Sequence, residues 1–149
     1  MKLEQRYSAG IAITYQGKIL LGHTTGRKAY HSYGISKGGI EEGESILDAA
    51  IRETEEEFGI KVPKKLIGKN EYTFVVTSRK YKYNKVVYYY ILEIQDLSQI
   101  GLKTLEVPKS QLQLKEVDRA IFVGYQDAMK LIMQSQAPVI STLLNNGLI

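Results

Sequence analysis

The segment from Ser45 to Gly59 constrains the fold most, because it carries both the start and the stop of an α-helix. Ser45 can cap the first turn, and Asp48 follows three residues later in the manner of a capping box. Gly59 stands where a helix-ending glycine belongs, and Pro63 then blocks continuation of the helix. The pattern predicts a helix over Ser45–Phe58.

One side of this predicted helix is apolar. Successive helical residues turn by about 100°, so five residues share a face that we expect to dock on a β-sheet. They are Leu47, Ala50, Ile51, Thr54 and Phe58. The rest of the chain must then supply that sheet.

Runs rich in β-branched and aromatic residues lie on both sides of the helix in the sequence. Tyr7–Thr14 and Lys18–Gly22 favour the two strands of a hairpin around the turn Gln16-Gly17. Glu71–Ser78 and Tyr83–Ile94 are rich in Tyr, Val and Ile, which favour long strands. These four runs are the main strands of the predicted sheet.

Shorter elements complete the chain. Residues 24–39 favour a loop with a short strand at Tyr33–Ile35, and residues 95–115 have no clear pattern. Further on we expect a strand, a helix and a final turn or short helix, at Ala120–Val123, Tyr125–Gln134 and Ser141–Leu144. With no repeat and no linker, the economical interpretation is one α+β domain with a mixed sheet over residues 1–149.

Composition excludes several kinds of site. The 149 residues include no cysteine, which rules out disulfides, thiolate zinc sites and a cysteine nucleophile. The N-terminus is too polar for a signal peptide, and no apolar run approaches the roughly 18 residues of a membrane span, so we expect a cytoplasmic protein with no membrane partner. A net charge of +4 suits a polyanionic ligand such as a nucleotide or RNA.

Three glutamates gather on a second face of the predicted helix. Glu53, Glu56 and Glu57 have the i, i+3, i+4 spacing, at which like charges cost a helix a few tenths of a kcal/mol per pair. Hard cations such as Mg²⁺, Mn²⁺ or Ca²⁺ would neutralise them. The alternative is a solvated acidic stripe, and we assign the adjacent Glu55, which should face away, to that role.

Fixed spacings around these glutamates carry a resemblance to a known family. The pattern spans residues 38–60, and its members here are Gly38, Glu44, Arg52, Glu53, Thr54, Glu56, Glu57, Gly59 and Ile60. This arrangement resembles the Nudix box. Thr54 is the one departure, because the family has a bulky aliphatic residue there. Threonine fills a similar volume, so we expect a small change in packing and an intact site.

The resemblance implies a fold and a reaction. The fold is a mixed β-sheet sandwiched between helices, an α/β/α sandwich. The reaction is Mg²⁺-dependent hydrolysis of a phosphoanhydride bond, with Mn²⁺ as a possible substitute. The substrate would be a nucleoside diphosphate linked to another moiety, such as a dinucleoside polyphosphate, a nucleotide sugar, ADP-ribose or an NTP.

The resemblance also implies roles for the residues of the site. The metal ligands would be Glu53, Glu56 and Glu57, with Glu53 either a further ligand or the base that takes the proton of the attacking water. Arg52 would orient this cluster by pairing with a glutamate such as Glu44. Relatives often carry an extra ligand or base where Glu116 lies, although Glu116 can also be an ordinary loop residue.

The segment Ser36-Lys37-Gly38-Gly39 resembles the Pro-Lys-Gly-Gly segment of relatives that hydrolyse diadenosine polyphosphates and inositol pyrophosphates, with Ser36 in place of the proline. We expect Lys37, Gly38 and Gly39 to contact substrate. Lys37 would hold a phosphate that is not cleaved, unless it is a solvated loop lysine. Tyr33, in the preceding loop, is a further candidate for substrate contact.

Downstream markers do not identify the substrate. Relatives that cut ADP-ribose often carry a proline downstream of the box, and relatives that cut diadenosine polyphosphates often carry a tyrosine. The corresponding stretch here is Val75–Ser78, which contains neither residue. The basic residues near the predicted hairpin tip, Arg79, Lys80, Lys82 and Lys85, favour either an RNA 5′-end pyrophosphohydrolase or a solvated turn that guards an edge strand.

Two further points stay open. A nucleotide-sensing module that cuts nothing is another alternative, although such proteins usually lose box glutamates, and the chain can be a monomer or a homodimer. His23 and His31 have no partner at metal or triad spacing, so we expect both to be structural or solvent-exposed.

Overall fold

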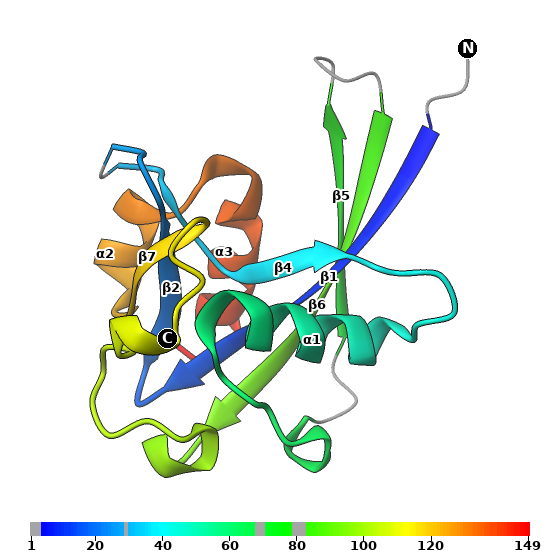
Figure 1. The fold of residues 1–149 in the computed structure, drawn as a ribbon. Helices are drawn as coiled ribbons and strands as arrows, with labels where there is room; N and C mark the ends of the chain where they lie inside the picture. Colours follow the sequence, from blue (N-terminus) through cyan, green and yellow to red (C-terminus); the bar gives the residue numbers. More distant parts are fainter. Residues whose placement is uncertain (1–3, 29, 68–70, 79–82) are drawn as a thin grey trace.

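Seven strands form one mixed sheet in the part of the chain that the computed structural model describes, which comprises residues 4–28, 30–67, 71–78 and 83–149 (Figure 1). Five strands follow the order β3-β2-β1-β6-β5, while β4 pairs with β1 and β7 pairs with β2. The strands are β1 (Glu4–Tyr15), β2 (Lys18–Thr24), β3 (Tyr33–Gly34), β4 (Ser36–Gly39), β5 (Glu71–Ser78), β6 (Tyr83–Ile94) and β7 (Val117–Val123).

Helices cover both faces of this sheet (Figure 1). Within the described ranges the α-helices are α1 (Ile46–Phe58), α2 (Tyr125–Leu131) and α3 (Ala137–Asn145), and short 3₁₀ turns lie at Lys64–Leu66, Leu97–Ile100, Lys109–Gln111 and Gln134–Gln136. One face carries α1 and the other carries α2 and α3, which confirms the predicted sheet between helices. None of the described helices has the length and apolar character that a membrane crossing needs.

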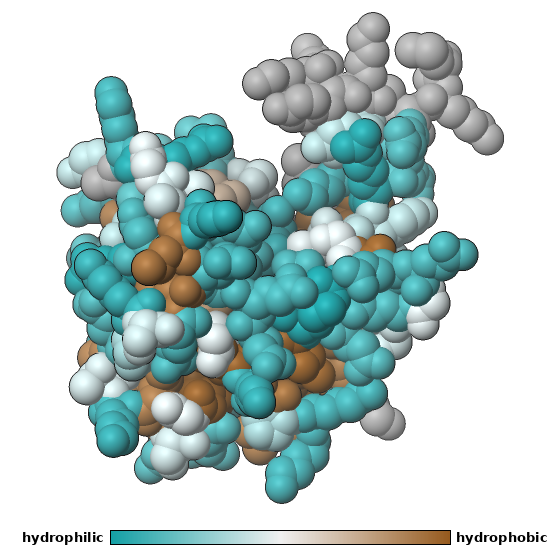
Figure 2. Space-filling view, in the orientation of Figure 1, coloured by the Kyte–Doolittle hydropathy of each residue, from teal (hydrophilic) through white to brown (hydrophobic). Residues whose placement is uncertain are grey.

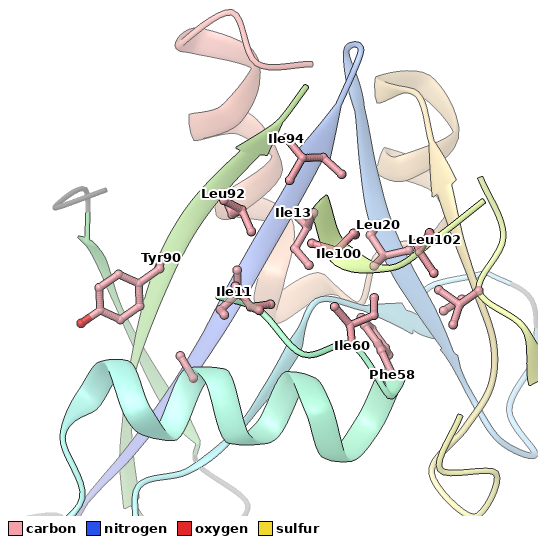
Figure 3. Packing of buried hydrophobic residues seen from close by; sticks show 14 of the residues in the cluster. Ile11, Ile13, Leu20, Phe58, Ile60, Tyr90, Leu92, Ile94, Ile100 and Leu102 are labelled. Atoms are coloured by element: carbon pink, nitrogen blue, oxygen red, sulfur yellow. The ribbon is translucent and has the colours of Figure 1, made fainter. Parts of the chain in front are cut away.

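Two apolar cores hold the layers together. On the α1 side, Phe58 and Ile60 pack against Ile11, Ile13 and other buried residues of the sheet (Figure 3). On the opposite side, α2 and α3 bury their apolar residues against the other face of β1, β2 and β6. Because side chains alternate across a strand, the same strands supply both cores.

The sheet places β4 beside α1. The central pair is β1 and β6, which run parallel from Glu4↔Tyr83 to Tyr15↔Ile94. On the other edge of β1, β4 pairs antiparallel, with Lys37 opposite Gly10. The segment that resembles the phosphate-contacting loop of the family is therefore a short strand held against the centre of the sheet.

Elements with strong local patterns occur where the sequence predicts them. Glu71–Ser78 and Tyr83–Ile94 are strands with the predicted bounds. Ser45 caps α1, with its hydroxyl oxygen accepting a hydrogen bond from the Asp48 amide at 3.0 Å. Gly59 ends α1 in the left-handed conformation, with φ of 65°, which glycine adopts without steric cost.

Elements set by distant contacts differ from the prediction. The segment 24–39 contains two short strands, β3 and β4, where we predicted one at Tyr33–Ile35. The helix predicted over Tyr125–Gln134 ends at Leu131, because Ile132 leaves the helix to pair with Tyr33. The last helix begins at Ala137, earlier than the predicted Ser141–Leu144, since Pro138 fits a first helical turn.

Candidate active site

The helix α1 is rotated about its axis relative to the predicted docking. Its buried residues are Ala49, Ala50, Thr54 and Phe58. Leu47 and Ile51, which we expected on the docking face, are only partly buried. Because residues four apart share a stripe, burial of Ala49 also turns Glu53 and Glu57 toward the sheet. The rotation brings two acidic side chains into the protein, where solvent does less to screen their charge.

The four glutamates of the helix differ in exposure accordingly. The side chain of Glu53 is 14% exposed and that of Glu56 is 54% exposed. Glu55 faces away from the others, with its carboxylate 4.0 Å from the ammonium of Lys61. This confirms the prediction that Glu55 stands apart from the cluster. The outward side of α1 is hydrophilic in the space-filling view (Figure 2).

Arg52 forms hydrogen bonds to three of the glutamates of the box. Its Nε and Nη2 donate to the two carboxylate oxygens of Glu44 at 2.8 and 3.0 Å, a bidentate pair. Its Nη1 donates to Glu53 at 2.8 Å and to Glu56 at 3.2 Å, while Nη2 also donates to the carbonyl of Gly39 at 2.9 Å. The predicted pairing of Arg52 with Glu44 is therefore present, and it links the loop before α1 to the glutamates on it.

Glu57 is the acidic residue most affected by its surroundings. Burial, followed by the negative charges of Glu53 and Glu116, raises the pKa of Glu57 to about 8. Lys37 opposes this shift through its charge and through a backbone hydrogen bond to the carboxylate. Burial also raises the pKa of Glu53. The site thus concentrates negative charge that the protein's own cations only partly offset.

Gly38 is required by a close approach. A Cβ atom at this position would overlap the carboxylate of Glu53, whereas one at the neighbouring Gly39 would meet nothing within 4 Å. A glycine at position 38 therefore lets Glu53 lie directly against β4. This gives a physical reason for the first glycine of the box.

A pocket of about 200 Å³ opens beside Glu57. Its charged lining comes from Lys37, Glu57 and Glu116, and Phe58, Met133 and Gln136 add to its wall. Glu116 immediately precedes β7, and its carbonyl oxygen accepts a hydrogen bond from the amide of Thr25 at 3.0 Å. The fold therefore brings Glu116 to the acidic residues of α1 from a separate loop.

Lys85 joins Lys37 near this pocket. The two residues come from β6 and β4, yet their ammonium groups interact directly. Burial and the charge of Lys37 lower the pKa of Lys85 to about 8. The two adjacent ammonium groups form a positive region, of which Lys37 acts on the carboxylate of Glu57. Lys85 is one of the four basic residues predicted near a hairpin tip, and the other three, Arg79, Lys80 and Lys82, lie outside the described residues.

Tyr33 does not line this pocket. It lines a second cavity instead, together with His23, Asp118 and Arg119. There its ring lies 5.0 Å from that of His23. His23 itself has a partner that its sequence position does not reveal, since its Nδ1 lies 2.6 Å from a carboxylate oxygen of Asp118.

The oxygen-rich donor set fits a hard divalent cation. Glu53, Glu56, Glu57 and Glu116 offer carboxylate oxygens, the ligands that Mg²⁺ and Mn²⁺ prefer. In the described residues no three such groups already converge as a metal site, because Arg52 holds Glu53 and Glu56 while Glu57 turns to Lys37. A bound cation would have to draw the carboxylates away from these partners.

A polar residue that lines the pocket, Gln136, was missed by the sequence analysis. Gln136 and its hydrogen-bond partner Tyr89 are both 2% exposed. Tyr89 lies in a strand that we predicted, but its neighbours depend on the pairing of β6 with β1. Gln136 lies between two helices and carries no sequence pattern that points to the site. Only the three-dimensional packing identifies it.

Comparison with known families supports the resemblance. A family model described as NUDIX domain matches residues 4–143, nearly the whole chain. No curated protein matches it significantly.

Solved structures share the fold at low sequence identity. A MutT NUDIX hydrolase from Burkholderia pseudomallei superposes with a TM-score of 0.70 and 16% identity, covering 93% of this chain and 97% of that one. The C. elegans Ap4A hydrolase gives 0.67 and 20%, covering 97% and 98%. A bifunctional NMN adenylyltransferase/ADP ribose pyrophosphatase from Francisella tularensis, complexed with AMP and Mn ion, gives 0.70 and 15%, covering 98% of this chain and 42% of that one. With the family model covering almost the entire chain, and with Arg52 joining Glu44, Glu53 and Glu56 of the box, this chain belongs to the Nudix family of hydrolases that act on phosphoanhydrides.

Proposed function

We propose that this protein hydrolyses a phosphoanhydride bond in a nucleotide that carries several phosphates, such as a dinucleoside polyphosphate or a nucleoside triphosphate. The observation that carries the proposal is the juxtaposition of Glu57, Glu116 and Lys37 around one pocket, with Lys85 beside Lys37. Acidic groups for a metal and basic groups for phosphates thus lie next to one another.

Glu53, Glu56 and Glu57 would hold Mg²⁺, with Mn²⁺ as a substitute. When bound, such an ion supplies charge neutralisation at the phosphates and makes a water molecule a better nucleophile. The protein contributes the arrangement of its own groups. Arg52 orients Glu53 and Glu56, and burial of Glu57 increases the advantage of a cation at that carboxylate. The Francisella relative, crystallised with Mn ion, is consistent with this cofactor.

Glu116 is our candidate for the base. It lines the pocket next to Glu57, and it is exposed, so water can reach its carboxylate. It comes from the loop before β7 and not from α1, and it can accept a proton without serving as a ligand. Replacing Glu116 by Gln should lower kcat by about 10²- to 10⁴-fold, the range for loss of a general base. Unchanged turnover would remove it from the site and leave Glu53 as the base.

Lys37 and Lys85 favour a substrate with more negative charge than one pyrophosphate link. Two ammonium groups that lie together repel each other, and burial of Lys85 increases the cost. A phosphate group bound between them would remove this repulsion. Among the structural relatives, the C. elegans protein is an Ap4A hydrolase and the Francisella protein includes an ADP ribose pyrophosphatase. The lysine pair favours the former kind of substrate.

RNA 5′-end hydrolysis is the alternative. Of the four basic residues that favour it, Lys85 interacts with Lys37, which lines the pocket. Salt separates the two functions, because binding of an RNA chain through many phosphates weakens steeply with ionic strength. If kcat/KM on 5′-triphosphate RNA falls steeply with salt and exceeds that on small nucleotides, RNA is the better substrate.

The main test is a substrate panel in the presence of Mg²⁺. It should include diadenosine polyphosphates, nucleoside triphosphates, ADP-ribose, nucleotide sugars and 5′-triphosphate RNA. Glu57→Gln should lose turnover, whereas Glu55→Gln should keep it, because Glu55 lies on the same helix but faces Lys61. Absence of product from every substrate at high enzyme concentration would contradict the hydrolase function and favour a sensing module.

A further inference from the structure

The buried side chain of Gln136 replaces a missing length of strand pairing. Its Oε1 accepts a hydrogen bond from the amide of Ile35 at 2.8 Å, and its Nε2 donates to the carbonyl of the same residue at 3.2 Å. Ile35 lies between β3 and β4 and is buried, so its two backbone groups need such partners. The side-chain amide of Gln136 thus supplies the hydrogen-bond donor and acceptor that the backbone of a neighbouring strand would supply.

The segment before Gln136 pairs with the chain in the same manner. Tyr33 forms a bridge with Ile132, and the amide of Met133 donates to the carbonyl of Tyr33 at 2.8 Å. The backbone then turns away at Gln134–Gln136, and the side chain of Gln136 continues the pairing as far as Ile35. The contact is therefore part of a continuous ladder.

Tyr89 fixes the amide of Gln136. The Nε2 of Gln136 also donates to the hydroxyl oxygen of Tyr89 at 2.7 Å. Both amide hydrogens of Gln136 are then engaged, one by Ile35 and one by Tyr89, so the side chain has no donor left to read a substrate base. Although Gln136 lines the pocket, its contacts within the protein suit it to hold the chain.

Ile35 directly precedes β4, so its contact with Gln136 bears on the position of that strand. Lys37 and Gly38 follow two and three residues later, in β4. The backbone amide of Lys37 donates to the Glu57 carboxylate, and Gly38 lies directly against the carboxylate of Glu53. A displacement of β4 would therefore move the partners of both glutamates at once.

We propose that Gln136 is a positioning residue for the reaction, holding Ile35 so that β4 presents Lys37 and Gly38 to the glutamates of α1. The inference rests on the proposed function, since it concerns the same pocket. It assigns a role to the linker between α2 and α3, which lies outside the box and holds Ile35 through two hydrogen bonds.

The first test replaces Gln136 by Met, which keeps the length of the side chain and removes its hydrogen bonds. A small misplacement of catalytic groups can cost about 10²-fold in rate, so kcat should fall by about 10- to 100-fold, a larger change than the rise in KM that follows from moving Lys37. The matched control is Gln99→Met. The side chain of Gln99 likewise bonds to the backbone, accepting from the amides of Gln95 and Asp96, but it lies in a turn away from the pocket.

A readout without substrate separates this proposal from the proposed function. Mn²⁺ titration, followed by electron paramagnetic resonance, should show at least fivefold weaker binding by Gln136→Met than by the wild type or by Gln99→Met. If the wild type binds Mn²⁺ but cuts no substrate, the proposed function fails while this comparison still tests Gln136. All measurements should be made where thermal unfolding shows each variant to be folded.

Gln136→Glu provides a second variant if Gln136→Met does not fold. A carboxylate still accepts from the Ile35 amide and from the Tyr89 hydroxyl, but it can donate to the Ile35 carbonyl only when protonated. The ratio of its kcat to that of the wild type should therefore rise as pH falls. If Gln136 only stabilised the fold, this ratio would not change with pH as long as the folded fraction stayed constant. A folded Gln136 variant, Met or Glu, with wild-type kcat and wild-type Mn²⁺ affinity would overturn the proposal.

Discussion

Ser36 and Thr54 are hydrogen-bonded to each other between β4 and α1, with their hydroxyl oxygens 2.8 Å apart and both side chains buried. Thr54 is the position at which the chain departs from the pattern of the box, and Ser36 is the position at which it departs from the Pro-Lys-Gly-Gly segment of some relatives. Thr54 donates to the carbonyl of Ala50 at 2.9 Å, so Ser36 is the donor in the pair. The two departures are therefore explained by one interaction.

This pair predicts a specific pattern of stabilities. Thr54→Val should cost about 1–3 kcal/mol, the usual range for a buried hydroxyl left without a good partner, since the remaining contact of Ser36 with the Ile11 carbonyl is long at 3.4 Å. Ser36→Ala should cost less, because Thr54 keeps Ala50. The double variant should lose clearly less than the sum of the two. Urea unfolding of all four proteins measures this, and strict additivity would contradict the pairing.

The same pair shows what the sequence could and could not predict. Thr54 was identified as a packing position from its place on the helix, which is correct, but its hydroxyl partner depends on β4 lying against α1. The cap at Ser45 and the bounds of β5 and β6 follow from local chemistry and were predicted. The rotation of α1 was not, because it depends on how closely Ala49 approaches the sheet.

Glu57 should make the metal-free protein less stable as pH rises. Its folded-state pKa is about 8 against an ordinary value of 4.5, so the folded protein holds a proton that the unfolded chain has released between these pH values. The free energy of unfolding therefore falls from about pH 4.5 to about pH 8, by at most about 5 kcal/mol at about 1.4 kcal/mol per pKa unit. Urea titrations in EDTA should show this slope in the wild type.

Two comparisons identify Glu57 as the source of the slope. Glu57→Gln should flatten the pH dependence and be more stable than wild type at pH 8 without metal, while Glu55→Gln should retain the wild-type slope. Added Mg²⁺ should stabilise the wild type at pH 8 and leave Glu57→Gln nearly unchanged. A Glu57→Gln variant that keeps the wild-type slope would show that another group titrates.

Lys85 should matter for substrates with many phosphates. Lys85→Met should raise KM by about tenfold, which corresponds to loss of about 1.4 kcal/mol of binding, for diadenosine tetraphosphate or a nucleoside triphosphate. The effect on ADP-ribose, with one pyrophosphate link, should be smaller. Lys65→Met, at an exposed lysine of the turn Lys64–Leu66, is the matched control and should change neither. An equal increase in KM for both substrates would argue against a role for Lys85 in selecting substrates with more phosphates.

Gly38 and Gly39 provide a direct test of the geometry, because they are adjacent and a side chain would meet Glu53 at the first and no atom within 4 Å at the second. A Cβ at Gly38 overlaps the carboxylate of Glu53, the far end of a flexible side chain, so Gly38→Ala should fold and displace Glu53 from Arg52. We expect kcat to fall by about 10²-fold, as for other small misplacements of catalytic groups, and Mn²⁺ binding to weaken. Gly39→Ala meets no atom within 4 Å and should behave as wild type in both measurements.

If the two alanine variants lose activity equally, the sensitivity lies in the conformational freedom of the loop and not in the contact of Gly38 with Glu53. If neither loses activity, Glu53 can work from a displaced position, and the metal would then depend on Glu56 and Glu57.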